Sequence, residues 1–226
     1  MELHVISGAA RPGIPIVFLH GLGDSAATWA SCMTILGERF AVHAIDLPGH
    51  GDSPCPDRSD AYSRDGALDA IDAVLARVAP RPVLVGHSLG GYLALAHAAT
   101  RPGAARGLVV VNTGPGFRDP ERREEWNARS RRNAHRFGVS PQVAELNLQH
   151  DSVVMDRLAE MDLPTLVLAG SDDRPEYVTS GRYLERKMPH AHLTVVEGGE
   201  HSMHATSHAT DVAALIAAFV VALPES

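Results

Sequence analysis

The chain alternates between short, continuous apolar runs and longer stretches whose apolar residues have helical spacing. A continuous apolar run of four to eight residues is typical of a strand that is buried on both faces of a sheet. The runs predict strands at about 3–6, 14–19, 40–47, 82–85, 108–111, 164–169 and 193–196. We expect the first and shortest of these strands at an edge of the sheet.

Helical spacing fills the stretches between most of these runs. The clearest case is 63–78, where apolar positions 67, 68, 71, 74, 75 and 78 fall on one helical face. A helix is predicted at about 26–38, with Ser25 as its N-cap. Another follows the fourth strand and ends near residue 100, and two more are predicted at about 175–188 and 206–222.

Strands that alternate with helices indicate a mostly parallel sheet with helices on both faces. The sequence therefore predicts an α/β fold of about six or seven strands, organised as a single domain over 1–226. The segment of about 115–161 interrupts the alternation, because it has patches of helical spacing and no strand candidate. An insertion of this length between two strands favours a short helical lid or binding element.

Composition narrows the class of partner. The formal net charge is −7, which argues against nucleic acid, and no apolar run is long enough to span a membrane. The first residues lack the basic start and apolar core of a signal peptide, so we expect a cytoplasmic protein, a monomer or a homodimer. Cys32 and Cys55 fit no metal or redox spacing.

The segment Gly86-His87-Ser88-Leu89-Gly90 follows a predicted strand and precedes a predicted helix. In this context the pattern G-x-S-x-G indicates a sharp turn that pushes the serine side chain out of the sheet. Glycines are needed there because a Cβ on either side would collide with a neighbouring strand or helix. We therefore predict that Ser88 is a catalytic nucleophile.

Two other predicted strands are followed by groups that could activate Ser88. An acidic pair, Asp172 and Asp173, follows one strand, and His201 follows the last. The carboxyl ends of parallel strands meet at one edge of a sheet, where ligands also bind. A histidine has a pKa near 6.5 and can take the serine proton, while a carboxylate fixes its tautomer.

Two backbone N–H groups are candidates for stabilising an oxyanion. One is that of Leu89, which follows Ser88 at the start of a predicted helix. The other is that of Leu22, in the glycine-bounded loop after the strand at 14–19. Each such donor is worth about 3–4 kcal/mol in the transition state of acyl transfer.

Five segments together resemble a known family, the small serine hydrolases of the α/β-hydrolase fold. They are FLHG at 18–21, DLPGHGDS at 46–53, GHSLGG at 86–91, GSDD at 170–173 and GGEH at 198–201. The resemblance implies that Ser88 is the nucleophile, His201 the base, and Leu22 and Leu89 the oxyanion donors, with no cofactor. It favours Asp173 over Asp172 as the acid, because the family's acid usually falls three residues after the glycine that ends the strand. The chain departs from the family in its first strands, which are reduced to one short run.

Most of the 13 histidines must be incidental to catalysis. We interpret His20, His50 and His87 as residues that hold loops by hydrogen bonds. His204 and His208 lie near His201, but they adjoin no cysteine and do not favour a metal site, so no metal is predicted. His150 and Asp151, at the end of the insertion, are interpreted as a surface turn, and the alternative is that they line the pocket.

The predicted lid contains seven arginines between Arg118 and Arg136, interleaved with acidic residues. A solvated, salt-bridged helix face accounts for this pattern. The alternative is that Arg129 or Arg132 reaches the pocket and binds a substrate carboxylate. Four aromatic residues are candidates for lining the pocket, although ordinary core packing explains each equally well: Trp29, Tyr92, Phe117 and Trp126.

These features predict an enzyme that hydrolyses small to medium carboxylic esters through an acyl-enzyme. Its partners would be small-molecule esters, with lactones as close alternatives. A second hypothesis uses the same three residues on a carboxylated substrate, for C–C cleavage or elimination. A third is a non-catalytic small-molecule binder on the same scaffold, because one fold hosts many functions.

Overall fold

The computed structural model describes residues 1–224, which form a seven-stranded sheet. The strands are β1 (Val5–Ser7), β2 (Ile16–Leu19), β3 (Val42–Ile45), β4 (Val83–His87), β5 (Gly107–Val111), β6 (Thr165–Gly170) and β7 (Ala191–Val196), in the order β1-β3-β2-β4-β5-β6-β7. Only β1 is antiparallel to its neighbour, and it lies at an edge, as predicted. The predicted α/β fold is thereby confirmed.

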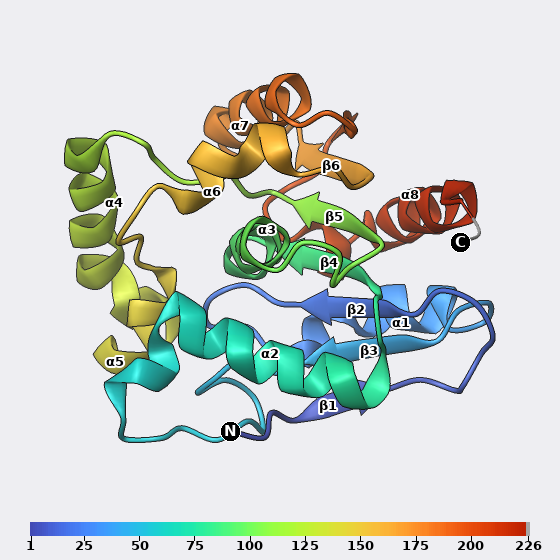
Figure 1. Cartoon of the computed structure of the whole chain (residues 1–226), viewed down its shortest axis with the longest axis horizontal. Coiled ribbons are helices and arrows are strands. Elements are labelled where there is room, and N and C mark those ends of the chain that lie inside the picture. Colours follow the sequence, from blue (N-terminus) through green and yellow to red (C-terminus); the bar gives the residue numbers. More distant parts are fainter. Residues whose placement is uncertain (225–226) are drawn as a thin grey trace.

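Helices cover both faces of this sheet (Figure 1). They are α1 (Ala30–Leu36), α2 (Arg64–Val78), α3 (Leu89–Thr100), α4 (Pro120–Asn133), α5 (Pro141–Ala144), α6 (Val153–Arg157), α7 (Pro175–Lys187) and α8 (Ala209–Ala222). Short 3₁₀ helices lie at Ala26–Trp29, Ser59–Tyr62, Ala134–Phe137, Glu145–Asn147, Leu158–Glu160 and Met203–Ala205. None of the helices within 1–224 combines the length and apolarity that crossing a membrane requires.

Alternate strand residues enter two separate cores, which explains the continuous apolar runs. In β2, Val17 and Leu19 pack in the core under α2, α3 and α7. Ile16 and Phe18 point to the other face and pack in the core with α1 and α8. Because both faces are covered, each strand residue is apolar whichever way it points.

The first helix differs from its prediction. A 3₁₀ turn at Ala26–Trp29 comes before α1, and the Ser25 side chain makes no capping hydrogen bond. The carboxylate of Asp46, after the end of β3, takes that place: its Oδ1 accepts a hydrogen bond from the Ala26 N–H at 2.6 Å. A partner that is distant in sequence thus replaces the local cap.

The insertion, residues 115–161, is helical and has no strand, as its spacing predicted. Asp119 caps α4 by accepting from the Glu121 N–H, and Pro120 occupies the first turn. In Figure 1 the arrowheads of β2 and β5 point toward α4 and α5, so the insertion lies at the carboxyl ends of the strands.

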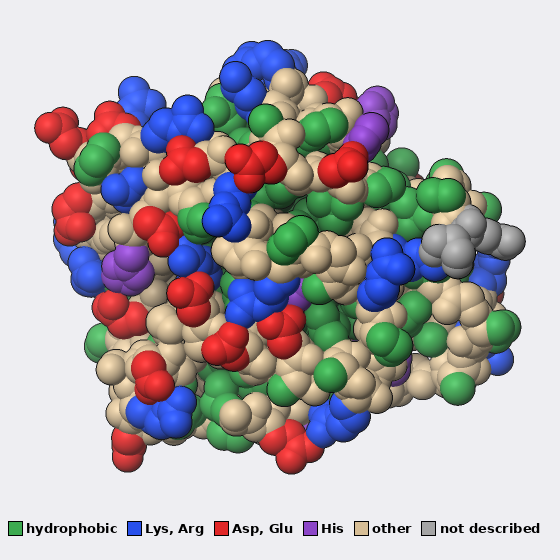
Figure 2. Space-filling model, viewed as in Figure 1, with side chains coloured by type: hydrophobic (Ala, Val, Ile, Leu, Met, Phe, Trp, Pro, Cys, Tyr) green, Lys and Arg blue, Asp and Glu red, His purple; other side chains and the backbone are tan. Residues whose placement is uncertain are grey.

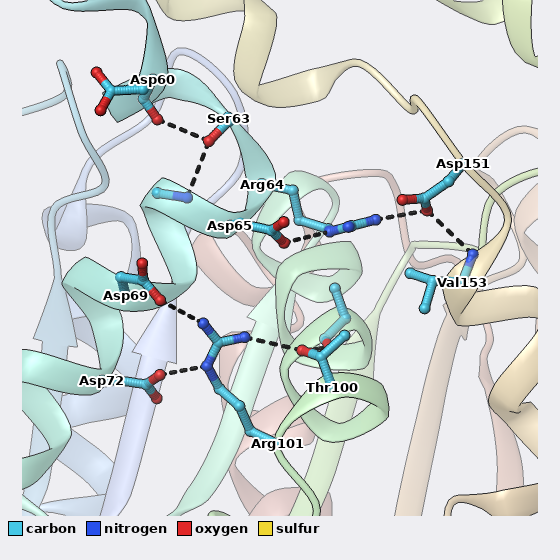
Figure 3. A network of polar contacts seen from close by, with 12 residues as sticks. Asp60, Ser63, Arg64, Asp65, Asp69, Asp72, Thr100, Arg101, Asp151 and Val153 are labelled. Carbon is cyan, nitrogen blue, oxygen red and sulfur yellow. Dashed lines mark hydrogen bonds and ion pairs between the residues drawn. The ribbon is translucent and has the colours of Figure 1, made fainter.

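Ion pairs tie these layers together (Figure 3). Arg64, whose side chain is 15% exposed, donates to Asp151 of the insertion at 2.6 Å. Arg101, which follows α3, pairs with Asp69 and Asp72 of α2. Elsewhere, acidic and basic side chains are interspersed over the face shown in Figure 2.

Candidate active site

Ser88 occupies the single residue between β4 and α3, with φ 50° and ψ −113°. Few non-glycine residues adopt this conformation, and such strain often occurs at active sites. The turn also brings backbones into contact. A Cβ on Gly86 would lie 2.3 Å from the Gly90 carbonyl oxygen, and one on Gly90 would lie 2.3 Å from that of Leu19. A side chain at either position would therefore collide with the backbone of a neighbouring segment, so both positions require glycine.

Three side chains from different strand ends form a hydrogen-bonded row. His201 Nε2 lies 3.2 Å from Ser88 Oγ, and His201 Nδ1 lies 2.7 Å from Asp173 Oδ2. Asp172 is exposed, and its carboxylate accepts from Ser171 Oγ instead. The structure thus brings Asp173, not Asp172, to the imidazole. The row has the geometry of a nucleophile, a base and an orienting acid.

The backbone of His201 is held from two sides. Its carbonyl oxygen accepts a hydrogen bond from Asn112 Nδ2 at 2.8 Å and another from His87 Nε2 at 2.8 Å. Asn112 is fully buried, and its Oδ1 accepts from the Gly170 N–H at 2.9 Å. Sequence reasoning missed Asn112, although its place directly after β5 was a usable signal.

The other histidines of the motifs hold loops, as interpreted from the sequence. His20 Nε2 accepts from the Leu47 N–H at 2.9 Å, and His50 Nε2 accepts from the Gly23 N–H at 3.1 Å. Burial lowers the pKa of His20 to about 4, so its ring stays neutral and keeps a nitrogen free to accept. Burial also lowers the pKa of His87 well below its ordinary value.

The two residues predicted as oxyanion donors lie in adjoining segments. The Gly90 N–H donates to the His20 carbonyl at 3.1 Å, which joins the loop after β2 to the start of α3. Leu89 lines the cavity beside Ser88, and Leu22 is buried in the neighbouring loop. Their roles as donors remain predictions.

A cavity of about 320 Å³ opens beside Ser88. Its wall also contains Leu89, Tyr92, Thr113, Gly114, Gly116, Phe117, Trp126, Arg129, Asn147, Gln149, Arg174, Glu176, Tyr177 and Ser180. Four residues predicted to bind substrate are therefore in the wall: Tyr92, Phe117, Trp126 and Arg129. Whether they bind substrate remains a prediction.

Two residues predicted to bind substrate, Trp29 and Arg132, lie outside the cavity wall, so these two predictions are corrected. Trp29 is fully buried on the other face of the sheet, with its ring centroid 4.8 Å from that of Phe18 and 4.1 Å from that of His204. Arg132 is exposed and lies in an adjoining hollow, which Phe117, Trp126 and Arg129 of the cavity wall also line. It is one helical turn beyond Arg129, about 4.5 Å farther along the axis of α4, and so outside the cavity wall.

Sequence reasoning also missed the start of α7 as part of the cavity wall. Arg174, Glu176, Tyr177 and Ser180 line the cavity, and the Tyr177 ring centroid lies 4.9 Å from that of His201. Their signal was adjacency, because they directly follow Asp173 at the carboxyl end of β6.

The histidines near His201 do not gather as metal ligands. His204 is buried with its ring between those of Trp29 and His87, and burial lowers its pKa to about 3. Within residues 1–224, the only cluster of potential metal ligands is His4, Asp46 and Asp52. There the Asp46 carboxylate already accepts hydrogen bonds from two backbone N–H groups.

Comparisons with known proteins agree with this architecture. The model of the Alpha/beta hydrolase family matches residues 16–215. A 2-succinyl-6-hydroxy-2,4-cyclohexadiene-1-carboxylate synthase of Escherichia coli is 34% identical over 152 residues, 64% of this chain and 56% of that protein. A pimeloyl-[acyl-carrier protein] methyl ester esterase of Chromobacterium violaceum is 41% identical over 115 residues, 50% of this chain and 41% of that protein. The chain thus spans about half the length of these curated relatives.

Similarity to solved structures extends over nearly the whole chain. The structure of MenH from S. aureus superposes with a TM-score of 0.82 over 97% of this chain and 98% of that one. The two sequences are 20% identical, so this similarity concerns the fold alone.

Proposed function

Because the chain belongs to the alpha/beta hydrolase family, we propose that it is a serine hydrolase that cleaves small to medium carboxylic esters through an acyl-enzyme. The observation that carries this proposal is the row Ser88–His201–Asp173, with contacts of 3.2 and 2.7 Å. The row opens on a cavity of about 320 Å³, near the lower end of the usual 300–1,000 Å³ for small-molecule sites. This size favours short acyl groups.

In the proposed mechanism, Ser88 Oγ attacks the ester carbonyl carbon while His201 Nε2 takes the hydroxyl proton. Asp173 stabilises the imidazolium and fixes its orientation. His201 then gives the proton to the leaving alcohol, and the acyl group stays on Ser88. A water molecule, activated by His201, attacks the acyl-enzyme and releases the acid.

The backbone N–H groups of Leu89 and Leu22 would bind the oxygen that becomes negative in each tetrahedral intermediate. Each donor would contribute about 3–4 kcal/mol to the transition state. Residues 115–161 would act as a short lid on a single domain, since they supply Phe117, Trp126 and Arg129 to the cavity wall. The sheet would then provide the reaction centre and the insertion the selectivity.

The direct test is hydrolysis of p-nitrophenyl acetate and butyrate. We expect turnover that is lost in Ser88→Ala, and labelling of Ser88 by a fluorophosphonate at one label per chain. Asp172→Asn, which alters an exposed neighbour of the acid, is the matched control for general damage. Absence of both turnover and labelling would support the non-catalytic binder instead.

A second candidate is elimination or C–C cleavage on a carboxylated substrate. The observation that favours it is the 34% identity with a relative named as a carboxylate synthase. Intact-protein mass spectrometry separates the two candidates. Acid quenching during ester turnover should trap Ser88 carrying the acyl mass in an ester hydrolase, whereas a purely proton-transferring site gains no mass.

A further inference from the structure

Two arginines of the cavity wall, Arg129 of α4 and Arg174 just before α7, make no ion pair with any carboxylate in residues 1–224. Two other arginines of the insertion are paired, whereas Arg122, Arg123, Arg132, Arg136 and Arg157 make no ion pair within residues 1–224; Arg129 differs from these five in lining the cavity beside Ser88. Arg118 contacts Asp156 at 2.9 Å, and Arg131 contacts Glu145 at 3.3 Å. The salt-bridged surface predicted for the insertion therefore does not include Arg129.

Both guanidinium groups are supported by aromatic rings of the same wall. Arg129 Cζ lies 4.9 Å from the Trp126 ring centroid, and Arg174 Cζ lies 5.6 Å from that of Tyr177. The indole is itself fixed, since its Nε1 donates to the Asn147 carbonyl at 3.0 Å. An arginine stacked on a ring keeps its N–H edge free for a planar, bidentate acceptor such as a carboxylate.

Both arginines line the same cavity as Ser88. The Tyr177 ring is near both Arg174 and the imidazole of His201, since its centroid lies 5.6 Å from Arg174 Cζ and 4.9 Å from the imidazole centroid. Burial raises the pKa of the Tyr177 phenol, and the charges of both Arg174 and Arg129 oppose this rise. The charges of Asp173 and Glu176 act on the same phenol and reinforce the rise.

The wall also contains one carboxylate, Glu176, which makes no ion pair within residues 1–224. Two cationic side chains thus face one anionic side chain, in a protein whose net charge is −7. This local excess of positive charge favours a singly charged anion over a neutral or cationic ligand.

From this geometry, and on the premise that the protein is a serine ester hydrolase, we propose that its substrates are esters whose acyl group ends in a carboxylate. The guanidinium groups of Arg129 and Arg174 bind that carboxylate, and the ester carbonyl lies at Ser88. The cavity volume of about 320 Å³ restricts the substrate to a monoester of a short dicarboxylic acid.

The test compares two esters that differ only at the far end of the acyl chain, monomethyl glutarate and methyl glutaramate. For the unmodified protein we expect kcat/KM to favour the carboxylate about tenfold or more, as expected for a hydrogen-bonded charge pair. Added NaCl should reduce this preference, because salt screens partly exposed charges.

Variants locate the effect. Arg129→Gln and Arg174→Gln should each lower the ratio of the two kcat/KM values, and the double variant should bring it close to one. Arg131→Gln, the matched control on the same helix, should keep the ratio of the unmodified protein, because Arg131 pairs with Glu145 and lies outside the wall. Glu176→Gln should raise the ratio, since it removes a repulsive charge.

Equal rates on the two esters, or a ratio unchanged in Arg129→Gln and Arg174→Gln, would overturn the inference. If p-nitrophenyl acetate is still hydrolysed in a Ser88-dependent way, the ester hydrolase proposal survives that result. If no Ser88-dependent hydrolysis is found, calorimetric binding of the glutaramate anion decides the matter. Binding that both arginine substitutions weaken supports the carboxylate site, and absent or unaffected binding refutes it.

Discussion

The carbonyl oxygen of His201 lies 2.8 Å from Nδ2 of Asn112, and this contact ties the proposed base to the strand beside the nucleophile. Asn112 directly follows β5, and the same side chain accepts from the Gly170 N–H at the end of β6. One buried amide therefore sets the relative positions of the loop that carries His201 and the strand end that precedes Asp173. Because Asn112 does not line the cavity, we expect it to position the row without contacting substrate.

Replacing Asn112 should reduce kcat by about tenfold to a hundredfold with a small change in KM, because small misplacements in a catalytic site have effects of this size. Asn112 has φ 46°, so Asn112→Gly removes the hydrogen bonds without backbone strain, and Asn112→Ala adds strain. Steady-state kinetics and the rate of fluorophosphonate labelling measure the effect. A normal kcat in Asn112→Gly with a reduced kcat in Asn112→Ala would show that backbone strain, and not the loss of the amide, lowers kcat.

The choice between the two acidic residues has a direct test. Asp173→Asn should lower kcat by about 10³–10⁴, the effect known for the equivalent change in a serine protease triad. Asp172→Asn, at an exposed neighbour that does not face His201, should keep kcat within about twofold. The reverse order in p-nitrophenyl ester assays would move the acid to Asp172.

The sequence allowed the prediction of residues whose position follows from the strand order. Ser88, Asp173 and His201 each come just after a predicted strand, and parallel strands bring their carboxyl ends together. Side-chain direction was harder. The aromatic Trp29 could face the cleft or the core, and only the packing of α1 against α8 assigns it to the core.

The insertion could be predicted only as helical. Its arginines are equivalent in sequence, but Arg129 lines the cavity and Arg132, one turn farther along α4, does not. Asn112 was missed because its contacts join it to Gly170 and His201, which are far from it in sequence. Arg174 and Tyr177 follow Asp173 directly, but their position in the sequence does not show that they line the cavity. The spacing of apolar residues along the chain does not predict such contacts.

Gly90 should be far less tolerant of alanine than Gly103. In Gly90→Ala the new Cβ would lie 2.3 Å from the Leu19 carbonyl oxygen, a backbone atom that cannot move aside. Overpacking of this kind costs about 1–3 kcal/mol or more. Gly103 has φ 82°, and a Cβ added there would meet no atom within 4 Å, so its alanine variant bears only backbone strain, about 1–2 kcal/mol.

Urea denaturation of the two alanine variants gives their free energies of unfolding. Gly90→Ala should have the lower midpoint and should also lose Ser88 labelling, whereas Gly103→Ala should keep it. Equal midpoints and equal labelling would contradict the close approach of α3 to β2.

Acid should destabilise the protein between pH 6.5 and about 3. Burial lowers the pKa of His204 to about 3, so in this window the unfolded chain binds a proton that the folded state does not. Stability from this group is complete above pH 6.5 and is lost as the pH falls. The group adds at most about 1.4 kcal/mol per pH unit to the slope of unfolding free energy.

His204→Leu should make that slope shallower by about this amount, measured by urea titration at several pH values from 7 to 4. Met203→Leu, an adjacent buried substitution without a titratable group, should shift stability equally at every pH. An unchanged slope in His204→Leu would mean that the ring titrates alike in both states.

The positive φ of Ser88 has a consequence for how this protein can change. A left-handed backbone at a serine costs about 1–3 kcal/mol, which the surrounding packing must offset. Glycine at this position would relieve the strain and leave a more stable chain without the proposed nucleophile. Substitution for stability alone would therefore work against the hydroxyl that the proposed mechanism needs.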